Sequence, residues 1–426
     1  MSKTFLKFFC VFFWGGIIFF LASLTYGQNY QSFQAENEHI RDTAKWRVGP
    51  FRISPRIQLR NIGYDDNIYD MRKDNNPISD YTATISPQAN IYLVYRNWLI
   101  FSFSEIPEYV YFFKEKKERS FNNSFSPGIK MLVFHRFALS GNYHYRKARR
   151  RASSEFDVRA EEKLKGYSGS FFYETARATS FGFSGSVQKI NYEDTTAPGE
   201  MILFSHALNR EEKSWSFELY YRIFPRSFFF LSGGATDYRF EYRESSWRDS
   251  YSYQAYCGIR FPLLGRARGI LSLGYKKMSP RNRELKGFSG LVGNTGLDFR
   301  IGRFDVRLNY IRDCYFSYTI GNVFFIENSY GSGISFYLTR FLRLDYDFTY
   351  GRNNYPEKIR VRLPGGGYQE IHRQDKYQAH TFAIVFRVIR NTGLGLMINH
   401  WGRDSNYFFE SNRRRWFVGG YLTFEF

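Results

Sequence analysis

The chain has 426 residues, a formal net charge of +20 and a mean hydropathy of −0.46, and aromatic residues make up 20% of it. Beyond residue 27 no apolar stretch approaches the about 20 residues that a membrane helix needs, which excludes a helical membrane protein. If the chain crosses a membrane, it must do so as a closed β-barrel, because lipid cannot satisfy unpaired backbone groups.

The N-terminus carries an export pattern. Lys3 and Lys7 precede an apolar run from Phe8 to Leu21, and small residues follow up to Gly27. This pattern predicts a signal peptide over residues 1–27. A membrane anchor is the alternative, but the run is short for a span. Export would exclude nucleic acid as a partner, despite the high isoelectric point.

Residues 28–50 are polar and show no strand alternation. We expect a periplasmic tail or a small plug there, with one short helix over residues 35–46.

Strand patterns then recur to the C-terminus, and their connections alternate short and long. The predicted strands are 51–67, 82–95, 98–113, 122–134, 137–149, 165–175, 179–193, 213–224, 227–242, 250–262, 267–279, 286–301, 304–317, 322–338, 341–354, 376–389, 393–404 and 414–426. They predict an all-β fold over residues 51–426, a transmembrane antiparallel up-and-down β-barrel of about 18 strands (16–18) in a bacterial outer membrane. Short turns and both barrel termini are expected on the periplasmic side. One long loop, 355–375, is predicted between two of these strands, with the tract from Pro364 to Gly367 as the tip of an external hairpin.

The last strand shows the alternation that identifies the two barrel faces. Trp416, Val418, Leu422, Phe424 and Phe426 fall on one face, with polar residues between them. We expect Leu422, Phe424 and Phe426 to form the assembly signal that the barrel-insertion machinery recognises.

The opposite face of the strands carries charge, which a dry core would reject, and a barrel of this width leaves room for a watery lumen. The lumen charges predicted from this alternation are Arg222, Arg260, Arg300, Arg307, Arg343, Arg387, Glu218, Asp298, Asp305, Asp345 and Asp347.

The surplus of positive charge falls at turns and outer loops. The predicted basic outer rim comprises Lys114, Lys116, Lys117, Arg149, Arg150, Arg151, Arg413, Arg414 and Arg415. Such a rim would attract anionic solutes, or bind an anionic polysaccharide or the phosphates of lipopolysaccharide and other outer-membrane lipids. The alternative is a solvated rim that only bridges lipopolysaccharide.

No catalytic constellation, cofactor motif or metal motif emerges. The seven histidines are scattered, and His144 is the first that we would inspect for a partner serine and acid. Cys257 and Cys314 lie on separate predicted strands, and we expect two free thiols.

The start of the barrel resembles a known family. The segment from Val48 to Pro55, followed by Gly63-Tyr-Asp-Asp-Asn-Ile68, is similar to the opening of the outer-membrane barrels grouped as "β-barrel porin 2". Some members of that family are associated with exopolysaccharide-biosynthesis operons. The resemblance implies a porin-like barrel that passes or secretes polysaccharide, and no catalytic residues.

The predicted function is passive or weakly selective passage of solutes, with an anionic saccharide as one candidate. The second hypothesis is a structural or polysaccharide-binding barrel whose lumen is plugged by residues 28–50 or by the 194–212 loop, in which residues 201–204 could fold inward. A hydrolase is the third.

Overall fold

The computed structural model describes residues 33–152, 155, 159–175, 179–197, 200–224, 227–264, 267–319, 321–362, 366–389, 391–407 and 411–425. The predicted signal peptide and Phe426 of the predicted assembly signal lie outside this range. No helix within it combines the length and apolar character needed to cross a membrane.

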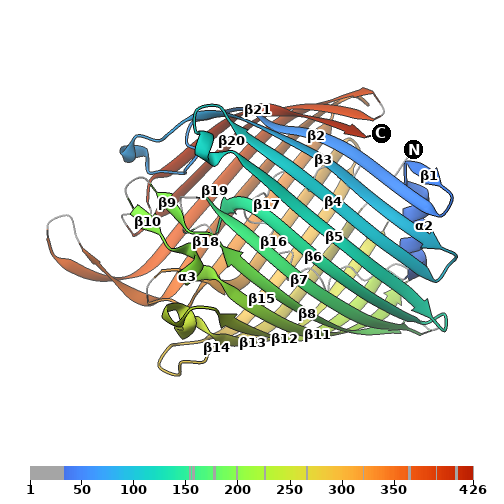
Figure 1. Ribbon diagram of the computed structural model, residues 1–426, viewed down its shortest axis with the longest axis horizontal. Helices are drawn as coiled ribbons and strands as arrows, with labels where there is room; N and C mark the ends of the chain where they lie inside the picture. Colours follow the sequence, from blue (N-terminus) through green and yellow to red (C-terminus); the bar gives the residue numbers. More distant parts are fainter. Residues whose placement is uncertain are drawn as a thin grey trace.

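Antiparallel strands close into one barrel, in which the first wall strand pairs with the last (Figure 1). The sheet has nineteen strands, of which the short β1 (Trp46–Val48) is an addition to β2, so eighteen form the wall. The wall strands are β2 (Phe51–Asp65), β3 (Asp80–Tyr95), β4 (Leu99–Phe112), β5 (Ser120–Val133), β6 (Phe137–Arg151), β7 (Arg159–Glu174), β8 (Thr179–Tyr192), β11 (Arg210–Phe224), β12 (Ser227–Phe240), β13 (Ser250–Leu264), β14 (Ala267–Pro280), β15 (Phe288–Ile301), β16 (Phe304–Phe316), β17 (Phe324–Tyr337), β18 (Leu342–Arg362), β19 (Tyr368–Ile389), β20 (Thr392–Ser405) and β21 (Arg413–Glu425). The predicted barrel and its strand number are confirmed.

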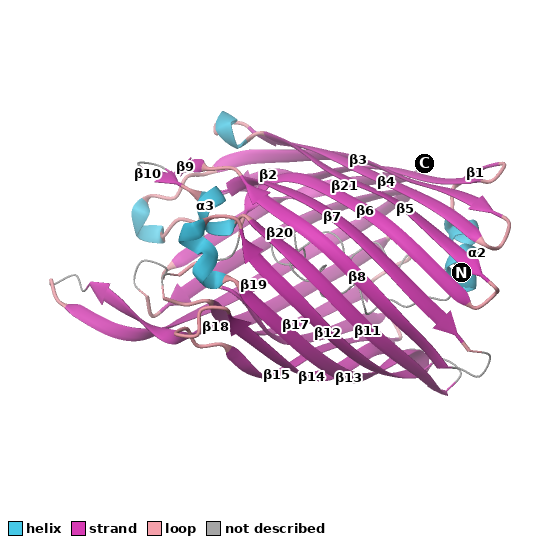
Figure 2. Cartoon of the chain, turned by 60° about the horizontal axis from the view of Figure 1, so that its bottom comes forward, coloured by secondary structure: helices cyan, strands magenta, loops and turns pink. Residues whose placement is uncertain are grey.

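The two ends of the barrel differ in their connections. The short-turn end carries tight turns such as 134–136 and 302–303, and both ends of the wall, at Phe51 and Glu425, lie there. The long-loop end carries the remaining short elements (Figure 2). These are η3 (Lys73–Asn75), η4 (Lys116–Glu118), the hairpin β9 (Thr195–Ala197) and β10 (Glu200–Ile202), α3 (Phe204–Leu208) and η5 (Arg243–Arg248). One helix, α2 (Phe33–Thr43), lies at the short-turn end.

The alternation within strands separates an apolar outer face from a polar inner one. On β11, Trp215 and Phe217 are 47% and 48% exposed, whereas Glu218 and Tyr220 are each 4% exposed. On β18, Arg343 and Asp345 are 8% and 1% exposed, whereas Tyr346 is 42% exposed. Cys257 is exposed and Cys314 is buried, and both are free thiols as predicted.

The hairpin predicted within 355–375 is present, but its strands are longer than predicted, and residues 363–365 at its tip lie outside the described part of the chain. β18 and β19 continue as a paired hairpin to Arg362 and Tyr368, and the hairpin projects beyond the rest of the long-loop end (Figure 1). The register shifts between Asn354 and Lys358, where extra residues interrupt the ladder. That interruption removes the alternation, which is why the sequence pattern stops at residue 354.

A bulge in β2 shapes the seam that closes the barrel. The pairing of β2 with both neighbours shifts around Asn61, which has a φ of 52°. The extra residue reverses the side-chain alternation. Tyr64 therefore faces outward beside Tyr81, with ring centroids 5.3 Å apart, whereas Asp65 is buried. This is the segment that carried the family resemblance.

Candidate functional site: the lumen and its two narrowed ends

Helix α2 lies inside the short-turn end of the barrel. Its Phe33 and Ile40 are 1% and 5% exposed, and they pack against inward side chains of the wall. The wall residues in this cluster come from β3 to β7: Val94, Ile100, Leu132 and Ala138, with Tyr92 and Phe172 at its edge. Phe33 and Ile40 are seven residues apart, about two helical turns, so they lie on the same face of the helix. The helix therefore presents an apolar stripe to the wall.

Polar contacts hold α2 at its edges. Lys130 on β5 forms an ion pair with Glu36. Arg41 donates to the backbone oxygen of Arg96 at 2.7 Å. Beyond the helix, Lys45 pairs with Glu425 near the end of the last strand, at 3.2 Å. The segment 33–48 therefore contacts both the lumen wall and the closing strand.

At the long-loop end, the tip of the β16–β17 hairpin leaves the wall and folds inward. β15 begins at Phe288, yet its pairing with β16 starts only at Gly293, opposite Arg312. Beyond Arg312, β16 pairs with β17 alone. On the other side, the β17–β18 ladder starts at Ile326 opposite Asn354. Both edges of the tip are thus free of the neighbouring wall strands.

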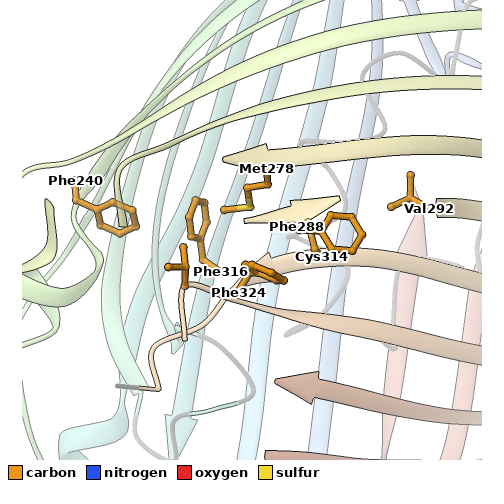
Figure 3. Packing of buried hydrophobic residues seen from close by; sticks show 8 residues of the cluster. Phe240, Met278, Phe288, Val292, Cys314, Phe316 and Phe324 are labelled. Carbon is orange, nitrogen blue, oxygen red and sulfur yellow. The ribbon is translucent and has the colours of Figure 1, made fainter. Parts of the chain in front are cut away.

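The inward tip packs against the inner wall of strands that are not its neighbours. Cys314, Phe316 and Phe324 are buried in one cluster with Phe240, Met278, Phe288 and Val292 (Figure 3). The Phe316 ring lies 5.5 Å from that of Phe240 on β12, four strands away in the wall. The other face of the tip is buried as well. Its Phe325 packs against Tyr355 of β18, with ring centroids 5.5 Å apart, and both side chains are buried.

The turn of this hairpin reaches the opposite side of the barrel. Glu155, in the connection between β6 and β7, accepts hydrogen bonds from the Ser317 hydroxyl at 3.0 Å and the Thr319 hydroxyl at 2.7 Å. It also accepts one from the Tyr318 backbone at 2.8 Å. In the closed order of eighteen wall strands, β16 lies eight strands from β6 in one direction and ten in the other, so this contact crosses the mouth.

Buried charges anchor the same turn to β19 and β20. Arg373 donates to the Thr319 hydroxyl at 2.7 Å and pairs with Asp375 at 2.9 Å. Arg403 also pairs with Asp375, which is fully buried. Glu155 also lies 3.9 Å from Arg373, so the turn, this carboxylate and the Arg–Asp–Arg cluster form one buried network. Such pairing is what makes buried charge tolerable.

Two further elements cover this end. Phe204 and Leu208 of α3 are fully buried against inward residues of β7 and β8, with Tyr318 at the edge of the cluster. Arg248 of η5 donates to the Ala207 carbonyl at 2.6 Å and lies 5.5 Å from the Tyr318 ring centroid. Burial lowers the pKa of Arg248 and raises that of Tyr318. Phe204 folds inward as the plugged-lumen hypothesis expected, whereas Leu203 is 46% exposed.

Between the two narrowed ends lies a cavity of about 370 Å³. Hydroxyl groups dominate its inner wall on β6 to β12, and they pair with one another. Ser140 pairs with Ser170 at 2.7 Å, and Ser184 with Ser216 at 2.6 Å. Most charges of the cavity are paired: Glu162 with Arg146 and Arg150, Lys276 with Asp313, and Arg210 with Glu212. Glu218 instead accepts from the Tyr220 hydroxyl at 3.0 Å, and Arg312 donates to the Asn328 side chain at 2.7 Å. The cavity is thus lined by hydroxyl and amide groups together with charges that are mostly paired.

Several of the predicted lumen charges form local pairs. Arg307 pairs with Asp347 at 2.6 Å, and Arg343 with Asp345 at 3.0 Å. Arg300 lies 3.6 Å from Asp305. Other members have different surroundings: Asp298 pairs with Arg268, Glu218 accepts from Tyr220, Arg222 is exposed above the Phe228 ring, and Arg387 lines a small hollow with Arg340.

The predicted basic rim is not a uniform solvated ring. Arg149 pairs with Glu118, Arg150 with the buried Glu162, and Arg151 with Asp70. Arg415 pairs with Asp65 and Arg414 with Asp404, while Arg413, at 3% exposure, donates to the Asp70 carbonyl. Lys114, Lys116 and Lys117 are the exposed members. The arginines hold strands and loops together, because their acidic partners come from distant segments.

Comparison with known proteins decides the family. A family model described as "Putative beta-barrel porin 2" matches residues 42–423. The chain belongs to this family. No curated protein matches the sequence.

Solved outer-membrane structures resemble this porin-family chain weakly. The outer membrane protein opdK from Pseudomonas aeruginosa shows 9% identity and a TM-score of 0.48, over 88% of this chain and 98% of that one. OpdO from the same organism shows 12% identity and a TM-score of 0.46, over 88% and 97%. The siderophore receptor PirA from Acinetobacter baumannii shows 7% identity and a TM-score of 0.47, over 88% and 80%.

Several charged residues that line the cavity or hold the hairpin turn were not predicted from the sequence. Glu162 and Lys276 follow the alternation of the polar face of their strands. Glu162 was missed because the predicted strand begins at residue 165, after it. Lys276 lies within the predicted strand 267–279, and applying the alternation there would have found it. Arg373 and Asp375 fell in the predicted loop 355–375. Glu155 sits in a connection and gives no signal in the sequence.

Catalytic and metal chemistry gain no support from the described part of the chain. Within it, no group of three or more His, Cys, Asp or Glu side chains could hold a metal ion. His144 lies on β6, two residues before Arg146 and on the same face of the strand, and it is half-buried.

Proposed function

We propose that this chain forms a solute channel of the bacterial outer membrane, with its short-turn end in the periplasm and its long-loop end outside. The observation that carries the proposal is the closed wall of eighteen strands, apolar outside and charged or hydroxylated inside, around a cavity. A lumen with that lining suits water and polar solutes, as in porins.

The selectivity that we propose is weak. The sequence suggested a basic rim that attracts anions, yet most rim arginines have acidic partners within the same end of the barrel. Paired charges produce a much smaller field than isolated ones. We therefore assign a modest anion preference to Lys114, Lys116 and Lys117, and no dedicated anion site.

Reconstitution in planar bilayers tests the channel. The purified full chain should give discrete current steps in potassium chloride, and the heat-denatured protein should give none. Absence of steps at every applied voltage, with protein shown to be inserted, would contradict the proposal.

A second function is favoured by the two segments inside the lumen. If α2 and the β16–β17 tip remain in place permanently, the barrel would be a binding or structural protein. The discriminating measurement is hydrogen exchange of the amides in 33–43 and 313–326 in the membrane-inserted protein. Exchange only on global unfolding supports a permanent plug, whereas faster exchange than the wall strands supports a channel whose ends open.

A further inference from the structure

We infer that the central cavity is a binding site for a small neutral polyol of about one or two sugar rings; this inference names the solute class of the proposed channel and rests on that function. Three observations carry it: the size of the cavity, the chemistry of its wall and the pairing of its charges.

The size fits a bound solute and not merely trapped water. Ligand pockets usually enclose about 300–1,000 Å³, and this cavity encloses about 370 Å³. Its long-loop side is covered by the inward hairpin tip, whose Cys314, Tyr315 and Phe316 contribute to the lining. A solute held there would thus be bounded by wall and tip together.

The wall offers hydroxyl and amide groups in a dense array on five neighbouring strands. Partly exposed side chains of this kind on β6 to β12 are Ser140, Asn142, Ser168, Ser170, Ser184, Ser186, Gln188, Ser214, Ser216, Ser232 and Thr236. A hydroxyl has one donor and two acceptor positions, so a serine pair keeps capacity for a further partner. Hydroxyl groups of a polyol, which both donate and accept, match this array.

Aromatic rings in the cavity offer apolar surfaces for the C–H faces of a polyol. Phe172, Phe230 and Tyr256 line the same cavity. The C–H faces of a polyol are apolar, and they can lie against rings while the hydroxyls bond to serines. A linear ether of similar size would use the rings but not the hydroxyl array.

The charges of the cavity disfavour an ionic ligand. Glu162 is 1% exposed and bonded to both Arg146 and Arg150, and Tyr192 donates to it at 2.8 Å. Lys276, 5% exposed, bonds to Asp313 at 2.8 Å. An anion would have to compete with buried carboxylates for these cations, at a desolvation cost that a neutral solute avoids.

Saturation-transfer NMR on the detergent-solubilised full chain tests the site without requiring conduction. Maltose is the probe, with gluconate as an anionic polyol and triethylene glycol as a neutral ether. We expect saturable maltose binding, and at least tenfold weaker binding of the other two. Equal binding of gluconate, or no saturable maltose signal, would overturn the inference.

Matched serine variants locate the site. S140A/S170A/S184A/S216A removes two serine pairs of the cavity and should weaken maltose binding about tenfold or more. S102A/S104A/S124A/S126A removes four serines of β4 and β5 outside the cavity and should leave binding unchanged. Loss in both variants or in neither would overturn the inference, and the wild-type probe series decides it if the first variant does not fold.

The outcomes separate this inference from the channel proposal. Bilayer current without maltose binding would leave the channel standing and remove the polyol site. Maltose binding without bilayer current would keep the site and remove the channel.

Discussion

The two ends of the lumen are narrowed by different kinds of interaction. At the short-turn end, α2 rests on an apolar cluster built around Phe33 and Ile40, with ion pairs only at its margin. At the long-loop end, the β16–β17 turn is bonded to Glu155 and Arg373, which are themselves buried. Segments far apart in the sequence meet at the second end, whereas α2 directly precedes the wall.

The difference between apolar contacts at one end and buried charge pairs at the other predicts how each end opens. Apolar contacts are non-directional, so an 11-residue helix can shift in steps, and a helix of that length is marginal when detached. Buried charge pairs are directional, and removing one partner leaves the other without compensation. We therefore expect gradual opening at α2 and switch-like opening at the hairpin turn.

The largest effect should come from Asp375→Asn. The change leaves Arg373 and Arg403 buried without their shared carboxylate, at a cost of about 3–5 kcal/mol. Urea unfolding in micelles measures the free energy. The matched control is Asp404→Asn, whose carboxylate is 57% exposed and should cost less than about 1 kcal/mol. Equal losses in the two variants would contradict the buried-pair account.

The next effect concerns the turn itself. Glu155→Ala removes three hydrogen-bond acceptor contacts from residues 317–319, at a cost of about 1–3 kcal/mol to the inward position of the tip. Proteolysis between 317 and 323 should become faster while the wall stays intact. Glu193→Ala, which removes an exposed acid paired with Lys163, is the control. Unchanged proteolysis in Glu155→Ala would show that Glu155 does not hold the tip.

An effect of similar size is expected at the other end. Ile40→Ser removes a buried apolar side chain from α2, and we expect about 1.5–3 kcal/mol weaker seating of the helix. Hydrogen exchange of residues 33–43 should accelerate, and exchange in β16 should not. Glu38→Ser on the exposed helix face is the matched change. If both substitutions accelerate exchange alike, helix propensity and not packing holds α2.

The smallest effect concerns selectivity. Replacing Lys114, Lys116 and Lys117 with Gln removes the exposed rim cations and should shift the reversal potential slightly toward cations at low salt. The shift should vanish near 1 M salt, where the Debye length is about 3 Å. The triple change Arg149→Gln, Arg150→Gln and Arg151→Gln should instead destabilise the barrel, since it removes the arginine that pairs with Glu118 and one of the two arginines that pair with each of Glu162 and Asp70. A large selectivity change with normal stability would instead support the anion-attracting basic rim predicted from the sequence.

The sequence was informative wherever one face of a strand met lipid. Alternation through Leu342, Tyr346 and Tyr350 located β18, and the same rule placed Arg343 and Asp345 in the lumen. The rule fails where both faces are buried in protein, as in 313–325, because apolar residues then occur consecutively. It also could not reveal that Arg150 pairs with Glu162, since the pairing depends on which strands become neighbours.

Single-channel conductance tests the central claim that an aqueous route runs through this lumen and is narrowed at both ends. The wild type, Ile40→Ser, Glu155→Ala and the double variant would be compared in the same bilayers and salt. Two constrictions in series predict that each single change raises conductance modestly and that the double variant exceeds both singles. Identical conductance in all four proteins would contradict the account, as would the absence of current steps in the inserted double variant.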